Sequence, residues 1–195
     1  MHRLIGFFTV LWGGAILLGF AKLWRYEGEP SPTATPKRER SIESAIQPRP
    51  GHFTLIMAAH PKCPCTRASL REIAKVLAHS PVPVDTYVVF YHPLHTSPEW
   101  AKTESYALAK AIRGVDTLFD EGGREAKRFH AVVSGQTLLY DSDGRLLFSG
   151  GITSARGHEG DNKQEAALMD LLNRRTTQPI QTPVFGCSLA EGFSR

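Results

Sequence analysis

Two cysteines flank a single proline in Cys63-Pro64-Cys65, and a third, Cys187, lies near the carboxyl end of the chain. A cysteine thiolate attacks disulfides and binds soft metal ions. An odd number of cysteines leaves at least one thiol free, or available for exchange with another protein. Three cysteines are also too few to build a disulfide-stabilised scaffold of 195 residues. These residues therefore predict a catalytic or metal-ligating role for the cysteines, and two buried structural thiols are the alternative.

The first two cysteines lie between an apolar run and a segment with helical periodicity. Residues 53–59 predict a buried strand, and residues 66–78 predict an amphipathic helix. The N–H groups at the start of a helix stabilise an anion and lower the pKa of a thiol there. Pro64 suits the first helical turn, where its missing N–H costs nothing. We therefore expect Cys63, the cysteine nearest the helix start, to be the attacking thiolate.

The spacing of the cysteines leaves their pairing open. Residues i and i+2 of a regular helix point about 200° apart, so a Cys63–Cys65 disulfide requires non-helical geometry or strain. The alternative partner is Cys187, because an extended tail after the last helix could cross the sheet and reach the other two. We favour Cys65 as the residue that resolves a mixed disulfide with substrate, since short loops cost less closure entropy.

The remaining pattern predicts further strands and helices in alternation. A β-branched and aromatic run predicts a second strand, an Asp-Gly turn predicts a hairpin, and an Asn162/Glu165 capping pair predicts the start of the last helix. The expected elements are a strand at 84–91, a helix at 97–114, a short helix at 124–130, hairpin strands at 136–140 and 145–149, and a helix from 162 to about 175.

The amino-terminal region predicts a membrane anchor. Residues 4–21 carry no charge and, at about 1.5 Å each, span about 27 Å as a helix. A cleaved signal peptide is the alternative, but its apolar region usually runs about 7–15 residues. Basic residues after the span outnumber Arg3 before it, which alone favours a cytoplasmic domain. The very short amino-terminal tail and the cysteine chemistry favour export, so we expect the domain on the periplasmic side of a bacterial inner membrane.

The chain therefore divides into an anchor at residues 1–25, a linker at 26–51 and one domain at 52–195. The linker holds five prolines among charged and small residues. Such a composition predicts a semi-extended spacer without a core, which would hold the domain off the membrane surface.

The net charge of +4 does not indicate nucleic-acid binding. Residues 1–51 hold seven Lys and Arg against four Asp and Glu, whereas residues 52–195 hold 16 against 15. The domain itself is thus nearly neutral, and its basic residues are not clustered as a phosphate-binding face requires.

From residue 53 to 175, the chain resembles the thioredoxin-like superfamily, especially membrane-tethered bacterial proteins of the TlpA/ResA kind. The element order, the cysteines at the first strand–helix junction and the late LLYDSDG hairpin carry the resemblance. The Cys63-Pro64-Cys65 core and the PVFGC segment ending at Cys187 are also similar to a bacterial group labelled RedB. The resemblance implies an α/β thioredoxin-like fold, with a central mixed sheet flanked by helices.

The sequence departs from that family at two positions. The family motif is C-x-x-C, whereas Thr66 stands here where the second cysteine would fall. The family also places a cis-proline before the hairpin, and the matching residues here are Ser134-Gly135-Gln136. Because of these departures, the resemblance does not imply that substrates dock here as they do in ordinary thioredoxins.

Several histidines are weak candidates for metal ligands. Their imidazoles, together with the cysteine thiolates, would suit Cu(I) or zinc, but no spacing matches a known zinc module. In the implied fold, the long glycine-rich loop at residues 150–161 surrounds the cysteines, and its histidine is a candidate general base or a solvated loop residue. The candidates are His60, His92, His95 and His158.

Together these features predict a membrane-anchored thiol–disulfide oxidoreductase that acts through Cys63, Cys65 and Cys187. We expect a protein thiol or disulfide, or a membrane redox partner, as its substrate, with no cofactor and no nucleic acid. The alternatives are a thioredoxin-fold accessory protein that binds copper or zinc, and a peroxide-reducing enzyme with a sulfenic acid intermediate.

Overall fold

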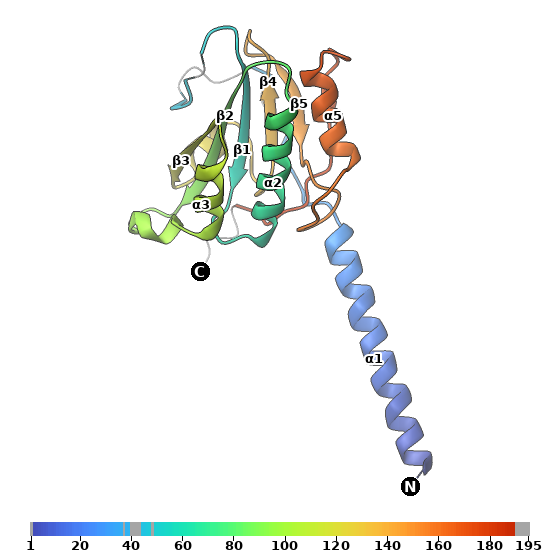
Figure 1. Ribbon diagram of the computed structural model, residues 1–195. Helices are drawn as coiled ribbons and strands as arrows, with labels where there is room; N and C mark the ends of the chain where they lie inside the picture. Colours follow the sequence, from blue (N-terminus) through green and yellow to red (C-terminus); the bar gives the residue numbers. More distant parts are fainter. Residues whose placement is uncertain (1, 37, 40–43, 48, 190–195) are drawn as a thin grey trace.

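The structure is a computed structural model that describes residues 2–36, 38–39, 44–47 and 49–189. One long helix, α1, projects from a single body in which a sheet is covered by helices (Figure 1). The helices are α1 (His2–Gly28), α2 (Pro64–His79), the 3₁₀ helix η1 (Pro98–Ala101), α3 (Glu104–Ala111), α4 (Arg124–Arg128) and α5 (Lys163–Leu172). The strands are β1 (Phe53–Ala59), β2 (Val84–His92), β3 (Val115–Glu121), β4 (Thr137–Tyr140), β5 (Leu146–Gly150) and β6 (Ile180–Gln181).

Within the described residues, six strands form one mixed sheet in the order β3-β2-β1-β4-β5-β6. Strands β1, β2 and β3 are parallel, whereas β4 runs antiparallel to both β1 and β5. Strand β1, which precedes the cysteines, is therefore central, with the parallel β2 on one side and the antiparallel β4 on the other. Its neighbours cover both edges, so β1 is buried along its whole length and apolar apart from Thr54, in agreement with the predicted buried strand.

The side chains of β1 alternate between two apolar layers, as strand geometry requires. Leu55 and Met57 face the layer that α2, α3 and α5 form on one side of the sheet. Ile56 and Ala58 face the opposite layer, which contains α4. This second layer also includes Ile46 from the linker and Leu189 from the tail, so both ends of the chain help to cover that face.

Described parts of the linker contact the domain, although the composition predicts a spacer without a core. Ile46 is fully buried, and the backbone N–H of Leu146 in β5 donates to the Arg38 carbonyl. Glu39 also forms an antiparallel bridge with Arg145. These described parts of the linker therefore pack against the domain, held by buried side chains and by backbone pairing.

The elements after β2 differ in part from the prediction. The expected helix at 97–114 is divided into η1 and α3, because Thr103 adopts an extended conformation and donates its hydroxyl to the Pro61 carbonyl. Strand β3 was not predicted, since acidic residues near both of its ends interrupt its apolar residues. Helix α5 begins after the Asn162 cap, as predicted, but ends at Leu172 because Arg174 adopts a left-handed conformation with φ +56°.

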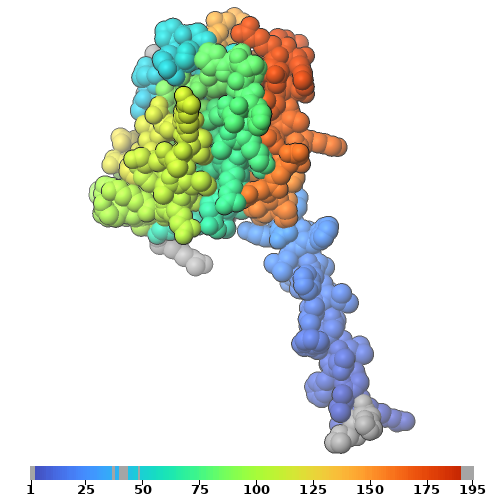
Figure 2. Space-filling view, in the orientation of Figure 1, coloured from blue at the N-terminus to red at the C-terminus, as the bar shows by residue number. Residues whose placement is uncertain are grey.

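Helix α1 stands clear of the body in the space-filling view (Figure 2). Residues Arg3–Gly28 are long and apolar enough to cross a membrane, and the apolar window within them is 0% buried against the domain. These properties are compatible with a single-pass membrane anchor. The end of α1 lies at the same end of the domain as the start of α2 (Figure 1).

Candidate redox site

Cys63 lies at the junction that the sequence predicts, between β1 and α2. It is the N-cap residue of α2, with an extended backbone, and Pro64 occupies the first helical turn. Its side chain is 3% exposed. The 16-residue helix that follows directs its positive end at this sulfur, which favours the thiolate.

Cys187 reaches the same place from the far end of the chain. The tail segment, residues Pro183–Leu189, forms an antiparallel bridge between Ser188 and Val133. The Ser134 N–H donates to the Cys187 carbonyl at 2.8 Å. The Sγ atoms of Cys63 and Cys187 consequently lie 3.2 Å apart, although 124 residues separate them in sequence.

All three cysteines are thiols in this structure, and they contact one another. Hydrogen bonds from the Cys187 and Cys65 thiols lower the pKa of Cys63 far below that of an ordinary thiol. The same contacts raise the pKa of Cys65, whose thiol faces both of the others. The hydrogen bond to Cys63 is also the main cause that raises the pKa of Cys187. The contacts therefore favour a thiolate on Cys63 over one on Cys65 or Cys187.

Thr66 has a structural role at the position of the missing second family cysteine. Its hydroxyl lies 2.9 Å from the Ser134 hydroxyl and donates to the His60 carbonyl at 3.0 Å. Thr66 is fully buried. It therefore joins the cysteine junction to the segment on which the tail segment packs, and no sulfur is available there to pair with Cys63.

His60 lies beside the cysteines but is held by other contacts. Its ring stacks on Tyr91 and meets Trp100 edge-on, at centroid distances of 5.9 and 5.7 Å. Its Nδ1 accepts from the Lys62 N–H at 3.2 Å. Burial lowers the pKa of His60, although the nearby Cys63 opposes that shift. The neutral imidazole thus forms part of the aromatic wall next to the site.

The other candidate histidines have different environments. His92 is buried, with its Nε2 3.0 Å from the Ser97 carbonyl, whereas His95 and His158 are exposed. Among the described residues, no group of three or more His, Cys, Asp or Glu side chains is arranged to hold a metal ion. Metal binding by these residues stays a weak alternative.

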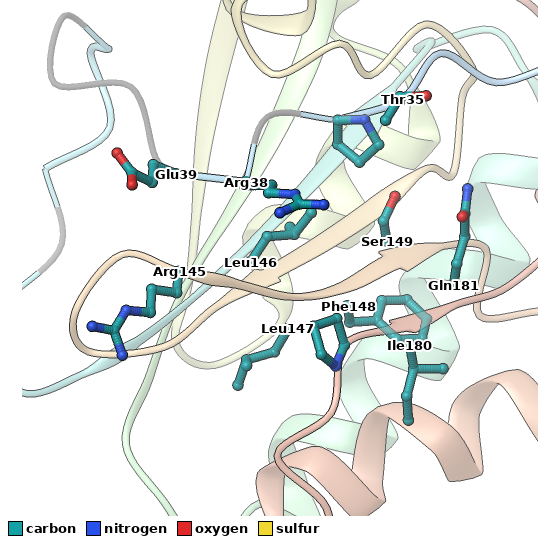
Figure 3. A pocket seen from close by; sticks show the side chains of 12 residues that line it. Thr35, Arg38, Glu39, Arg145, Leu146, Leu147, Phe148, Ser149, Ile180 and Gln181 are labelled. Carbon is teal, nitrogen blue, oxygen red and sulfur yellow. The ribbon is translucent and has the colours of Figure 1, made fainter.

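Two surface pockets differ in their relation to the cysteines. One, of about 580 Å³, opens between the linker and strands β5 and β6, and Figure 3 shows Arg38, Ser149 and Gln181 among the side chains around it. None of its lining residues is a cysteine. A smaller pocket of about 300 Å³ is lined by Cys63 itself, together with Lys62, Pro64 and residues of α3. This second pocket gives Cys63 its opening to solvent, despite the burial of most of its surface.

Comparisons with known proteins place the arrangement among solved folds. No protein-family model and no curated protein sequence matches the chain. An uncharacterized conserved protein from Geobacillus kaustophilus is 18% identical, with a TM-score of 0.58 over 83% of this chain and 92% of the other. The hypothetical protein SMc02350 from Sinorhizobium meliloti is 20% identical, with a TM-score of 0.56 over 71% of this chain and 79% of the other.

A secreted Mycobacterium tuberculosis disulfide oxidoreductase homologous to E. coli DsbE is 14% identical, covering 64% of this chain and 82% of the other, with a TM-score of 0.44. In this chain, a parallel strand–helix–strand unit precedes an antiparallel hairpin and a final helix, and the cysteines lie where the first strand meets its helix. The chain has a thioredoxin-like fold. The resemblance predicted from the sequence is confirmed at this level, and at these identities the likeness concerns the fold alone.

The structure also draws attention to a residue that the sequence did not single out. Arg156 lies in the loop between β5 and α5, and its guanidinium donates to the Gly186 carbonyl, one residue before Cys187. The length and glycine content of that loop predict a functional segment, but the residue they single out is His158. Nothing local distinguishes Arg156 from the other surface arginines, because its partners lie 30 and 125 residues away.

Proposed function

We propose that this protein is a thiol–disulfide oxidoreductase in which Cys63 attacks and Cys187 resolves. The observation that carries the proposal is the 3.2 Å contact between the two sulfur atoms, at the start of α2. Cys65, which the spacing favoured as the resolving residue, also contacts both sulfurs but lies within the first turn of α2. Cys187, on an extended segment, is free of the helical geometry that keeps residues i and i+2 apart.

The proposed exchange has two steps. The Cys63 thiolate attacks one sulfur of a substrate disulfide, an S–S bond forms to Cys63, and the other substrate sulfur leaves as a thiolate with the electron pair. Cys187 then loses its proton and attacks the Cys63 sulfur, which releases the second substrate thiolate. The substrate disulfide gains two electrons, and Cys63 and Cys187 become a disulfide. The reverse sequence oxidises a substrate dithiol.

The electrostatics of the site suit this order. The pKa of Cys187 is raised chiefly because its thiol donates to Cys63, and Arg156 opposes that rise. Once Cys63 is bound in a mixed disulfide, it no longer carries the charge that favours this donation. The pKa of Cys187 then falls, so the resolving thiolate becomes available at the step that needs it.

The partner that fits this site is a protein thiol or disulfide close to a membrane surface. Ser31, three residues after the end of α1, contacts the Gly186 carbonyl beside Cys187. If α1 spans a bilayer, the cysteines lie next to that bilayer rather than away from it. We therefore propose a membrane redox protein, or a substrate near the bilayer, on the periplasmic side. The exchange itself uses only sulfur atoms of the chain and of its substrate.

The test is to trap the mixed disulfide. The full chain in detergent, as Cys187→Ser and separately as Cys65→Ser, is mixed with oxidised glutathione and its intact mass is measured. We expect a persistent glutathione adduct on Cys63 in Cys187→Ser, and its rapid loss in the wild type and in Cys65→Ser. Cys63→Ser is the control that should hold no adduct at position 63.

Other outcomes assign the site differently. A lasting adduct in Cys65→Ser but not in Cys187→Ser would make Cys65 the resolving residue. Turnover with hydrogen peroxide but not with disulfides would indicate peroxide reduction through a sulfenic acid. No adduct in either variant, with loss of a bound copper or zinc ion from both, would replace the redox proposal with metal binding.

A further inference from the structure

Arg156 joins three parts of the chain that are distant in sequence. Its Nε donates to the Tyr26 carbonyl at 3.0 Å, and its Nη2 donates to the Ser31 hydroxyl at 2.9 Å. Its Nη1 donates to the Gly186 carbonyl. Its backbone N–H also donates to the Glu27 carbonyl at 3.1 Å, and its guanidinium lies 4.7 Å from the centre of the Tyr26 ring. One side chain thus contacts the end of α1, the start of the linker and the tail segment.

Ser31 reinforces the same connection from the linker side. Its N–H donates to the Val184 carbonyl at 2.8 Å, and its hydroxyl donates to the Gly186 carbonyl at 2.6 Å. The Gly186 carbonyl therefore accepts hydrogen bonds from both Ser31 and Arg156. Bonds from a guanidinium are stronger than neutral ones, and the planar donor set of arginine fixes the directions of several acceptors at once.

The other side of the tail segment is fixed by close packing. Gly186 lies so near Ser134 that an added Cβ would fall 1.8 Å from the Ser134 carbonyl oxygen. The next residue, Cys187, accepts a hydrogen bond from the Ser134 N–H. The backbone at residues 186–187 is thus held between Ser134 on one side and Arg156 with Ser31 on the other. This placement directs the Cys187 sulfur toward Cys63.

We propose that Arg156 is a positioning residue that holds Cys187 beside Cys63, and that the end of α1 with its following residues, Tyr26–Ser31, is a working part of the redox site. This inference rests on the proposed function. Without the guanidinium, the Gly186 carbonyl keeps only the hydrogen bond from the Ser31 hydroxyl, and the tail segment loses its connection to Tyr26. The Cys187 sulfur then spends less time near Cys63, so their disulfide forms less readily. The anchor thus sets the redox properties of the site as well as its location.

The inference has a second, electrostatic part. The ionisable groups with the largest effects on the pKa of the Cys187 thiol are the thiols of Cys63 and Cys65 and the guanidinium of Arg156. Arg156 is the cation among them, and like the Cys65 thiol it lowers the pKa of Cys187, against the Cys63 contact and burial, which raise it. Replacing the arginine should therefore change both the position of Cys187 and the pH at which it ionises, and lysine should preserve the charge without the three-way contact.

The experiment measures the equilibrium of the full chain in detergent with glutathione. One molecule of oxidised glutathione converts the Cys63 and Cys187 thiols into a disulfide and becomes two molecules of reduced glutathione. We expect Arg156→Gln to lower this equilibrium constant about tenfold, as expected for loss of a charged hydrogen bond. Ser31→Ala should also lower the equilibrium constant, but by a smaller factor. Arg71→Gln is the matched control, because Arg71 bonds Glu159 of the same loop at 2.8 Å but contacts none of the cysteines.

The pH profile of Cys187 alkylation separates positioning from a merely structural effect. It should move to higher pH in Arg156→Gln, stay near wild type in Arg156→Lys, and not move in Arg71→Gln. The glutathione equilibrium should stay impaired in Arg156→Lys. If Arg156→Gln fails to fold, Ser31→Ala and Arg156→Lys carry the same test. The inference is overturned if folded Arg156→Gln or Arg156→Lys has the wild-type equilibrium constant and Ser31→Ala has it too. A wild-type chain that forms no Cys63–Cys187 disulfide overturns the proposed function instead.

Discussion

The two cysteines of the proposed pair, Cys63 and Cys187, are held in position in different ways. Cys63 stands at the junction of a buried central strand and a 16-residue helix, so its position follows from regular structure on both sides. Cys187 stands on an extended segment and owes its position to contacts with Ser134, Ser31 and Arg156. The attacking sulfur is therefore placed by local structure, and its partner by residues scattered over the chain.

This difference predicts different sensitivities. Regular structure around Cys63 forms cooperatively and tolerates the loss of single contacts. The tail segment has few contacts, and each of them carries a larger share of its placement. Substitutions near Cys63 should therefore affect chemistry or overall stability, whereas substitutions around Cys187 should affect the pairing of the two sulfurs. Four variants test this contrast.

The largest effect is expected from Cys63→Ser. A hydroxyl at the helix start does not ionise at neutral pH, so no nucleophile remains for the first step. We expect the rate of reduction of a disulfide substrate to fall by more than about 10³-fold, as for loss of the nucleophile in other enzymes. Turnover assays on the folded full chain measure it. Residual activity above a tenth of wild type would mean that another cysteine attacks.

Gly186→Ala should disturb the tail segment and leave the helix junction intact. The new methyl group cannot fit 1.8 Å from the Ser134 carbonyl oxygen, so the backbone next to Cys187 must move. Because disulfide geometry tolerates little displacement, we expect the Cys63–Cys187 equilibrium with glutathione to fall by about 10- to 100-fold. Gly28→Ala is the control, since nothing lies within 4 Å of its added methyl group. An unchanged equilibrium in Gly186→Ala would show that the tail segment adapts.

Cys187→Ala tests how far the helix alone activates Cys63. The Cys187 thiol is the largest cause that lowers the pKa of Cys63, so removing it should raise that pKa. A higher pKa means less thiolate at neutral pH, and a rise of one unit slows alkylation of Cys63 about tenfold there. Cys187→Ser keeps a hydroxyl donor and should lie between the wild type and Cys187→Ala. If all three proteins share one alkylation profile, the helix start sets the pKa without the tail.

Thr66→Val should have the smallest effect of the four. It removes the hydrogen bonds to Ser134 and to the His60 carbonyl with little change in side-chain volume. We expect the free energy of unfolding to fall by about 1–2 kcal/mol, measured by denaturant titration. The glutathione equilibrium should change less than twofold, because Ser134 still donates its N–H to the Cys187 carbonyl. A shift of tenfold would show that the helix junction and the tail segment are not independent.

Elements with a strong local signal could be predicted from the sequence. The apolar run of β1, the stripe of α2, the Asp-Gly hairpin of β4 and β5 and the Asn162 cap of α5 all match the structure. Strands β3 and β6 could not be predicted from the sequence, because an edge strand with acidic residues and a two-residue strand carry no distinctive periodicity. The contacts of the linker were not predicted for a related reason: its composition is polar, yet Ile46 within it is fully buried.

The sequence by itself determined the order of the central strand, the helix after it, the hairpin and the last helix, and the place of Cys63 at a helix start, since these follow from the periodicity of neighbouring residues. Only the tertiary structure decided which sulfur lies against Cys63 and which arginine holds it there. The contact between Cys63 and Cys187 joins residues 124 positions apart, and that between Arg156 and Ser31 joins residues 125 apart. Such contacts depend on how the tail segment and the linker pack over the finished sheet, and no pattern among neighbouring residues encodes that packing.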